Sequence, residues 1–264
     1  MRIAFIDSGI GMLSTVAAVR AARPDADLVL SMDPDHMPWG SRAPEAIVGR
    51  VLDGARAALD AADAGREHAA LDAIVVPCNT ASVHGLASLR AAFEPRIPVV
   101  GTVPPIKPAA ARGGPVAVWA TVATSRSHYQ QGLIEEFGQG VEIESVPCPG
   151  LAEAIESADP GAVEAAVDHA AGRTSPDAAA VVLGCTHYDL VQKAVSDALA
   201  GRAELYTAAE AVAAQTLRRL GSAPAPALAP TGTVTVLASG RPVALPEEAL
   251  AYAPGQDLAR ALQG

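Results

Sequence analysis

The sequence is poor in aromatic residues, which make up only 3% of its 264 residues. Few rings are therefore available to stack bases, and a formal net charge of −10 leaves no basic excess to attract phosphate backbones. Both properties argue against binding to nucleic acid or to an anionic membrane surface. A small acidic substrate remains compatible with this charge, because backbone N–H groups at helix N-termini bind anions locally.

Cysteine is also scarce, with three residues at Cys78, Cys148 and Cys185. An odd number without CxxC spacing argues against a disulfide framework and a zinc site, so we expect no bound metal. No apolar run approaches the roughly 18 residues that span a bilayer, and the first residues do not resemble a signal peptide. We therefore expect a cytoplasmic protein without a membrane segment.

Short apolar runs alternate with helical patterns along almost the whole chain. One helical stretch, Pro44–Ala62, places apolar residues at i, i+4 spacing with charged residues on its opposite face. This alternation predicts an α/β fold with mainly parallel sheets, because strands covered on both faces are continuously apolar. The expected strands are Arg2–Ile6, Asp27–Ser31, Ala73–Val76, Pro98–Val100, Pro115–Trp119, Val141–Val146, Ala179–Leu183 and Ala203–Tyr206, with a weaker one at Thr233–Leu237.

The chain contains a weak internal repeat that indicates two related α/β units. Residues 73–82 read AIVVPCNTAS and residues 180–189 read AVVLGCTHYD, each an apolar strand, a turn residue, a cysteine and a helix start. A Pro/Gly-rich passage at 103–115 and a Pro/Ala-rich connector at 221–230 suggest where the chain passes between parts. We expect a first domain of residues 1–97 plus 208–264 and a second domain of residues 98–207.

Cys78 and Cys185 are the strongest candidates for chemistry. Each follows a buried strand and precedes a helix, where the helix N-terminus lowers a thiol pKa. A single cysteine at such a place is usually a small core residue, but two at equivalent points of a repeat favour a reactive pair. Cys148 is flanked by Pro147 and Pro149, and we expect it to be structural.

Three acid–base residues accompany these thiols. Asp7 ends the first strand beside flexible glycines, where it either points into a cleft or caps the next helix. His187 lies two residues after Cys185 and is a candidate general acid or base. In a helix after Pro149, Glu156 falls at the edge of the apolar face while Glu153 falls on the opposite, solvated side.

Neutral polar groups suited to a carboxylate or an ammonium group follow several strand ends, although each by itself is more often a helix cap. The turn Pro38–Ser41 offers backbone N–H groups for an anion. The polar candidates at strand ends are Asn79, Thr80, Thr121, Thr124 and Thr186.

Five motifs in order closely resemble those of glutamate racemases, in the aspartate/glutamate racemase superfamily: DSGIG at 7–11, PWGSR at 38–42, CNTAS at 78–82, ATVAT at 120–124 and GCTHY at 184–188. The resemblance covers about residues 2 to 220. It implies two pseudo-symmetric α/β domains with the active site in the cleft between them, no cofactor, and production of D-glutamate for peptidoglycan precursors.

The resemblance also implies residue roles. Cys78 serves one face of the substrate α-carbon with help from Asp7, and Cys185 serves the other with help from His187 and Glu156. It implies that the substrate is held by Ser8, Pro38, Trp39, Gly40, Ser41, Asn79, Thr80, Thr121 and Thr186.

The sequence departs from the family pattern at Met12, at Trp39 in place of tyrosine, and at Asp189 in place of proline. Since Met12 and Trp39 are expected beside the substrate side chain, aspartate or a hydantoin remains an alternative substrate. A non-catalytic amino-acid-binding relative is a further alternative, whereas the presence of both cysteines disfavours a one-cysteine decarboxylase. The sequence leaves monomer and homodimer both open.

Overall fold

The computed structural model describes residues 1–63, 71–138 and 140–263, and these form two compact α/β units. Unit 1 comprises Met1–Thr102 and Ala209–Gly264, and unit 2 comprises Val103–Ala208. Within the described residues, no helix is long and apolar enough to cross a membrane.

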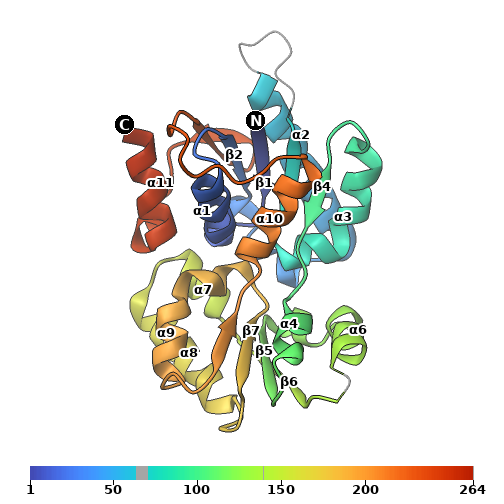
Figure 1. Ribbon diagram of the computed structural model, residues 1–264, viewed down its shortest axis with the longest axis vertical. Helices are drawn as coiled ribbons and strands as arrows, with labels where there is room; N and C mark the ends of the chain where they lie inside the picture. The colour runs from blue at the N-terminus through green and yellow to red at the C-terminus, as the bar shows by residue number, and fades with distance from the viewer. Residues whose placement is uncertain (64–70, 139, 264) are drawn as a thin grey trace. The chain divides into compact units, whose positions relative to one another are not determined.

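Unit 1 is built on a six-stranded sheet in the order β10-β9-β2-β1-β3-β4. Figure 1 labels β1, β2 and β4 of this sheet. All neighbours pair in parallel except β9 and β10, which form an antiparallel hairpin. The strands are β1 (Arg2–Ile6), β2 (Asp27–Met32), β3 (Ala73–Val76), β4 (Val99–Gly101), β9 (Val234–Ala238) and β10 (Arg241–Val243).

Helices cover both faces of this sheet. The helices α2 (Pro44–Asp63) and α3 (Asn79–Phe93) pack together on one face, and α1 (Leu13–Ala22) contacts α10 (Ala209–Arg219) and α11 (Ala253–Gln263) on the other. Short 3₁₀ turns complete the unit: η1 (Ile10–Met12), η2 (Pro34–His36), η3 (Trp39–Ser41) and η5 (Glu247–Ala251). The apolar stripe of α2 buries Ile47, Val51 and Ala55 against β1, β2 and α3, as its i, i+4 spacing predicts.

Unit 2 has a four-stranded, fully parallel sheet in the order β6-β5-β7-β8. Its strands are β5 (Val116–Ala120), β6 (Ile143–Pro147), β7 (Ala180–Leu183) and β8 (Glu204–Tyr206). One face packs on α4 (Ile106–Ala111) and α6 (His128–Phe137); α7 (Leu151–Glu156), α8 (Pro160–Arg173) and α9 (Gln192–Ala198) form the other layer. The short α5 (Val122–Ser125) follows β5, and the 3₁₀ helix η4 (Thr186–Val191) follows β7.

The two sheets share one topology. The order β2-β1-β3-β4 in unit 1 corresponds strand by strand to β6-β5-β7-β8 in unit 2. The predicted α/β fold with mainly parallel sheets and two related units is thereby confirmed. Both unit boundaries differ from those expected: residues 98–102 belong to unit 1, where β4 pairs with β3, and Ala208 belongs to unit 2.

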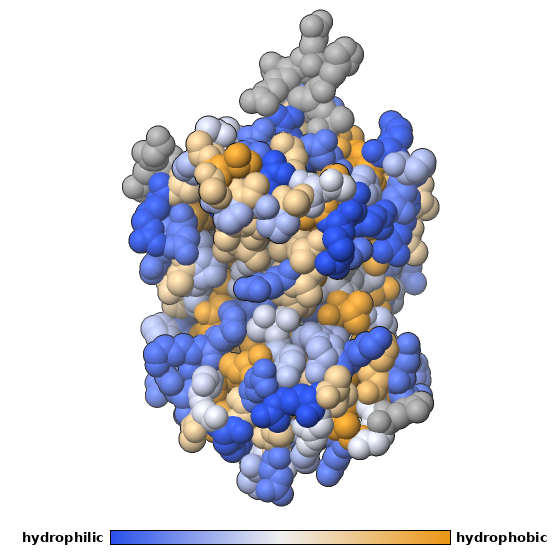
Figure 2. All heavy atoms as spheres, viewed as in Figure 1, coloured by the Kyte–Doolittle hydropathy of each residue, from blue (hydrophilic) through white to orange (hydrophobic). Residues whose placement is uncertain are grey.

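The surface is predominantly hydrophilic on the face drawn in Figure 2, where polar side chains cover α11 and α9 and apolar residues form separate patches. Among the described residues, the large hydrophobic side chains with substantial exposure are Val103, Leu228, Val243 and Leu250. They lie on different segments, so they do not form one long apolar stretch in the sequence.

Candidate active site

In unit 1, two candidate residues emerge from neighbouring strands. Asp7 follows β1 and Cys78 follows β3, and these strands pair in parallel register from Ile3 with Ala73 to Phe5 with Val75. Both side chains therefore lie at the carboxyl edge of the sheet, where open α/β sheets bind ligands. Cys78 is the N-cap residue of the 15-residue helix α3, whose N-terminal end favours a negative charge.

Asp7 is fully buried and makes close contacts with the residue that follows it. Its Oδ1 accepts a hydrogen bond from the Ser8 backbone N–H at 2.6 Å and another from the Ser8 hydroxyl at 3.3 Å. These bonds fix the orientation of the carboxylate, and they engage the Ser8 hydroxyl that was expected to contact the substrate.

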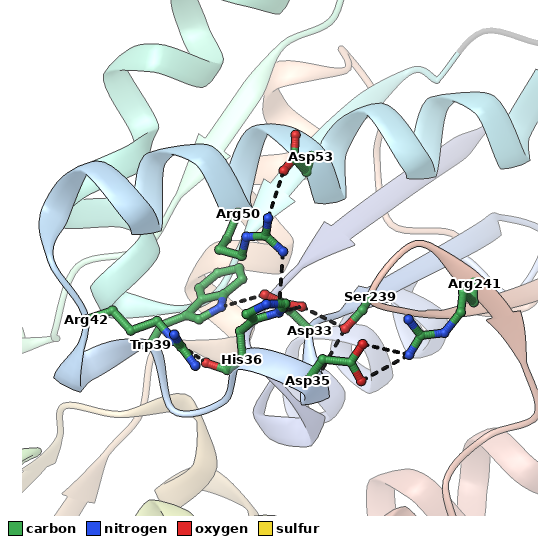
Figure 3. A network of polar contacts seen from close by, with 9 residues as sticks. All are labelled: Asp33, Asp35, His36, Trp39, Arg42, Arg50, Asp53, Ser239 and Arg241. Atoms are coloured by element: carbon green, nitrogen blue, oxygen red, sulfur yellow. Dashed lines mark hydrogen bonds and ion pairs between the residues drawn. The ribbon is translucent and has the colours of Figure 1, made fainter.

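The turn Pro38–Ser41 follows β2 after a 3₁₀ turn, and its tryptophan points inward. Trp39 is 1% exposed, packs in the core between the sheet and α2, and donates its indole N–H to Asp33 Oδ2 at 3.0 Å (Figure 3). The Trp39 ring is therefore held inside unit 1, and the expectation that Trp39 lies beside the substrate side chain stays a prediction. The hydroxyl of exposed Ser41 donates to Pro38 O at 3.3 Å.

Asp33 is a residue that the sequence analysis missed. It ends β2 as Asp7 ends β1, and it receives hydrogen bonds from Trp39, from Ser239 Oγ at 2.7 Å and from His36 Nδ1 at 2.9 Å. Burial alone would raise the pKa of Asp33, but these bonds outweigh it and hold the pKa below its usual value. The only sequence signal for this role is an acidic residue placed directly after a strand.

Unit 2 contains a connected chain of three candidate residues. Cys185 is the N-cap residue of η4, and its Sγ lies 3.8 Å from His187 Nδ1. The other ring nitrogen, Nε2, lies 2.7 Å from Glu156 Oε2 on α7. The sidedness expected from helical geometry is observed, because Glu156 is partly buried against His187 while Glu153 is exposed.

The environment of His187 favours its charged form. Burial of the ring disfavours the imidazolium, but the contacts with Cys185 and Glu156 outweigh burial and raise the pKa well above its ordinary value. The structure therefore places a charged imidazolium ring 3.8 Å from the Cys185 sulfur.

Two further buried groups surround this trio. Burial raises the pKa of Cys148 to about 12, and its Sγ contacts Val146 O at 3.4 Å, so the thiol is neutral at physiological pH and suits a structural role. Asp189 is 8% exposed, one of its oxygens has no hydrogen-bond partner among the described residues, and burial raises its pKa to about 8.

The neutral polar candidates divide into caps and buried groups. Thr121 caps α5, because its Oγ1 accepts from the Thr124 backbone N–H at 3.3 Å and bonds the Thr124 hydroxyl at 3.0 Å. Asn79 and Thr186 are buried directly after the two cysteines, and Thr80 is partly buried. In the described part of the chain, no three His, Cys, Asp or Glu side chains come together as metal ligands.

Comparison with known proteins gives a consistent result. The profile described as Asp/Glu/Hydantoin racemase matches residues 8–216. The glutamate racemase of Pseudomonas entomophila (strain L48) is 34% identical over 224 residues, covering 83% of this chain and 81% of the relative. The glutamate racemase of Roseiflexus sp. (strain RS-1) is 40% identical over 197 residues, covering 72% and 68%.

Solved structures agree with these sequence relatives. Escherichia coli glutamate racemase, crystallised with L-glutamate and the activator UDP-MurNAc-Ala, matches with a TM-score of 0.80 at 28% identity, covering 98% of this chain and 94% of that chain. A glutamate racemase isoform from Bacillus anthracis matches with a TM-score of 0.69 at 27% identity, covering 89% and 86%.

Proposed function

Because the chain belongs to the Asp/Glu/hydantoin racemase family and is an isomerase of amino acids, we propose that it interconverts L- and D-glutamate without a cofactor. The choice of glutamate is supported by relatives named glutamate racemase and by the related structure crystallised with L-glutamate. Supply of D-glutamate for peptidoglycan is the corresponding physiological role, and rescue of a D-glutamate-requiring strain tests it.

The reaction inverts one carbon by removing the α-proton from one face and delivering a different proton to the opposite face. A thiolate on one side removes the α-proton, the electron pair passes into the substrate carboxylate, and a thiol on the other side returns a proton to the opposite face. In the proposed mechanism Cys78 and Cys185 take these two roles and exchange them with the direction of reaction. This exchange requires both sulfurs to reach the same substrate carbon.

The side chains beside each thiol support this assignment. The imidazole of His187, held by Glu156, can stabilise a thiolate at Cys185 or return a proton to it. The buried Asp7 lies on the strand next to the one that carries Cys78. General acid–base catalysis contributes about 10²–10⁴-fold, and oriented groups that stabilise the developing charge supply the remainder.

Substrate binding is assigned to groups at the same strand ends. Backbone N–H groups of the Pro38–Ser41 turn suit a carboxylate, as do the buried side chains of Asn79 and Thr186. The proposed set is completed by Ser8, Thr80, Thr121 and Thr124. Thr121 and Thr124 would first have to give up the hydrogen bonds that they make to each other at the start of α5.

The observation that carries the proposal is the equivalent position of the two cysteines. Each follows the same strand of an identical strand order, β3 in unit 1 and β7 in unit 2, and each caps the helix that comes next. Packing alone does not require a cysteine at both points, whereas a two-base reaction needs a group at each point that can accept and return a proton.

Solvent-isotope incorporation tests the proposal directly. L-glutamate incubated in D₂O should yield D-glutamate that carries deuterium at the α-carbon. We expect Cys78→Ala and Cys185→Ala each to abolish this conversion, and the matched variant Cys148→Ala to retain it. Racemisation at a near wild-type rate in either of the first two variants would contradict the two-thiol mechanism.

A second substrate deserves the same assay, because Met12 and Trp39 differ from the family pattern near the expected site. A different substrate preference would be seen if the circular dichroism signal of L-aspartate or of a hydantoin decays faster than that of L-glutamate. Amino-acid binding without any exchange at the α-carbon would instead support a non-catalytic relative.

A further inference from the structure

The hairpin of β9 and β10 turns through two residues with unusual backbone angles. Ala238 pairs with Arg241, and the residues between them, Ser239 and Gly240, have φ angles of 46° and 79°. Positive φ at both positions is typical of a type I′ turn, which favours Asn or Gly at its first position. Serine is therefore a locally unfavourable choice, and such residues often mark a functional contact.

Ser239 is connected by hydrogen bonds to the Pro38–Ser41 turn, which is proposed to bind the substrate. Its hydroxyl donates to Asp33 Oδ1 at 2.7 Å, and Asp33 Oδ2 accepts the Trp39 indole N–H at 3.0 Å (Figure 3). The backbone N–H of Asp35 also donates to Ser239 Oγ at 3.3 Å, and Arg241 forms an ion pair with Asp35 at 2.8 Å. The hairpin thus bonds to Asp33 and to Asp35, both in the segment that precedes Pro38.

Core packing buries the Trp39 ring, but the segment before it also borders a cavity of about 80 Å³. This cavity is lined by Asp33, Trp39 and Ser239 and reaches Ile6 and Asp7. Side chains that border a void lose part of their van der Waals contacts, so directional hydrogen bonds carry more of the positioning. Asp33, with donors from three segments, is the point at which these bonds meet.

We propose that Ser239 is a positioning residue, which acts through Asp33 and Trp39 to set the position of the Pro38–Ser41 turn for the substrate. This inference rests on the proposed racemase function for its kinetic consequences. The hairpin lies outside residues 8–216, the part of the chain matched by the family profile. The tail therefore takes part in the active site rather than only completing the sheet of unit 1.

The variant Ser239→Gly separates positioning from stability. Glycine accepts a φ of 46° without steric cost, so the Tm should be unchanged or higher although the hydroxyl is lost. The substitution removes the hydrogen bond to the charged acceptor Asp33 and the longer one accepted from the Asp35 backbone N–H. We expect KM for glutamate to rise about three- to tenfold, with kcat changed by less than about twofold. Asparagine tolerates this backbone conformation and carries an N–H donor, so Ser239→Asn should have a KM close to that of the wild type.

Thr235→Val is the matched control, because it removes a hydroxyl from β9 without touching Asp33. Hydrogen exchange of residues 36–42 gives a second measurement that needs no catalytic activity. We expect faster exchange in Ser239→Gly and no change in Thr235→Val. Unchanged exchange in Ser239→Gly, or an equal KM increase in Thr235→Val, overturns the inference; a wild-type protein that fails to racemise glutamate contradicts the proposed function instead.

Discussion

The ion pair between His187 and Glu156 is the best place to test the chemistry of unit 2. Glu156→Gln keeps the size of the side chain and an oxygen that can accept from His187 Nε2 at the present 2.7 Å, but it removes the negative charge. The pKa of His187 should therefore fall towards its ordinary value. With less imidazolium present, a thiolate at Cys185 loses stabilisation.

The size of the effect follows from the difference between charged and neutral hydrogen bonds. A bond to a charged group contributes about 1.5–3 kcal/mol and a neutral one about 0.5–1.5 kcal/mol, so the substitution should cost about 1–1.5 kcal/mol. His187 is 3% exposed and the Glu156 side chain 20%, so solvent screens the pair little. If the same energy is lost in the transition state, kcat/KM falls about five- to tenfold near neutral pH.

The pH dependence of the free energy of unfolding shows over which pH range the His187–Glu156 ion pair is stabilising. The raised pKa of His187 makes the ion pair stabilising in full below the unfolded histidine pKa of about 6.5, and this contribution is lost as pH rises through the folded pKa. In urea unfolding, the free energy of unfolding of Glu156→Gln should therefore fall furthest below that of the wild type near pH 6, and the difference should be smaller at alkaline pH. The alkaline limb of the pH–rate profile should move to lower pH.

Glu153→Gln is the control, because Glu153 lies on the same helix, is exposed and does not contact His187. Since the two enantiomers of glutamate have equal free energy, kcat/KM must fall by the same factor in both directions, which checks the assay. An unchanged pH–rate profile in Glu156→Gln would refute the proposed role of the pair, as would equal effects of the two substitutions.

Two further substitutions test the surroundings of Cys185. Asp189 has a pKa raised to about 8, so between about pH 4 and pH 8 the unfolded carboxyl ionises while the folded one stays protonated, and stability falls. Asp189→Asn should raise the free energy of unfolding by about 1–3 kcal/mol at pH 8 and by less at pH 4, as measured by urea titration; equal gains at both pH values would contradict the assignment. At Gly184 an added Cβ would lie 2.8 Å from Trp119 O, so Gly184→Ala should cost about 1–3 kcal/mol and lower kcat by displacing Cys185. An unchanged kcat and Tm would show that the strand end tolerates the shift.

Local sequence patterns predicted the sheets because the relevant physics is local. The run Ala73–Val76 is continuously apolar and every residue in it is buried, as a strand covered on both faces requires. The repeated strand–cysteine–helix pattern likewise predicted that the two units share a topology. In contrast, β10 is three exposed residues including a proline, so it has no periodicity from which to predict a strand.

Contacts between segments far apart in the sequence depend less on local patterns, and only some of them were predicted. Glu156 and His187 are 31 residues apart, and helical geometry on α7 was sufficient to choose Glu156 over Glu153. Asp33 and Ser239 are 206 residues apart, and no local pattern joins them. The motif at 38–42 likewise gave no sign that the core of unit 1 buries the Trp39 ring or that Asp33 accepts its indole N–H.

The repeat in the sheets does not extend to the groups that assist the thiols. The residue after β1 is Asp7, whereas the residue after β5 is Thr121; two residues beyond Cys185 is His187, whereas two residues beyond Cys78 is Thr80. A carboxylate raises the energy of a nearby thiolate, while an imidazolium lowers it. Under the proposed mechanism the two thiols are therefore assisted by chemically different groups, a carboxylate in unit 1 and an imidazole in unit 2. Because kcat/KM is equal in the two directions, we expect this difference to appear as unequal kcat and KM values for L- and D-glutamate.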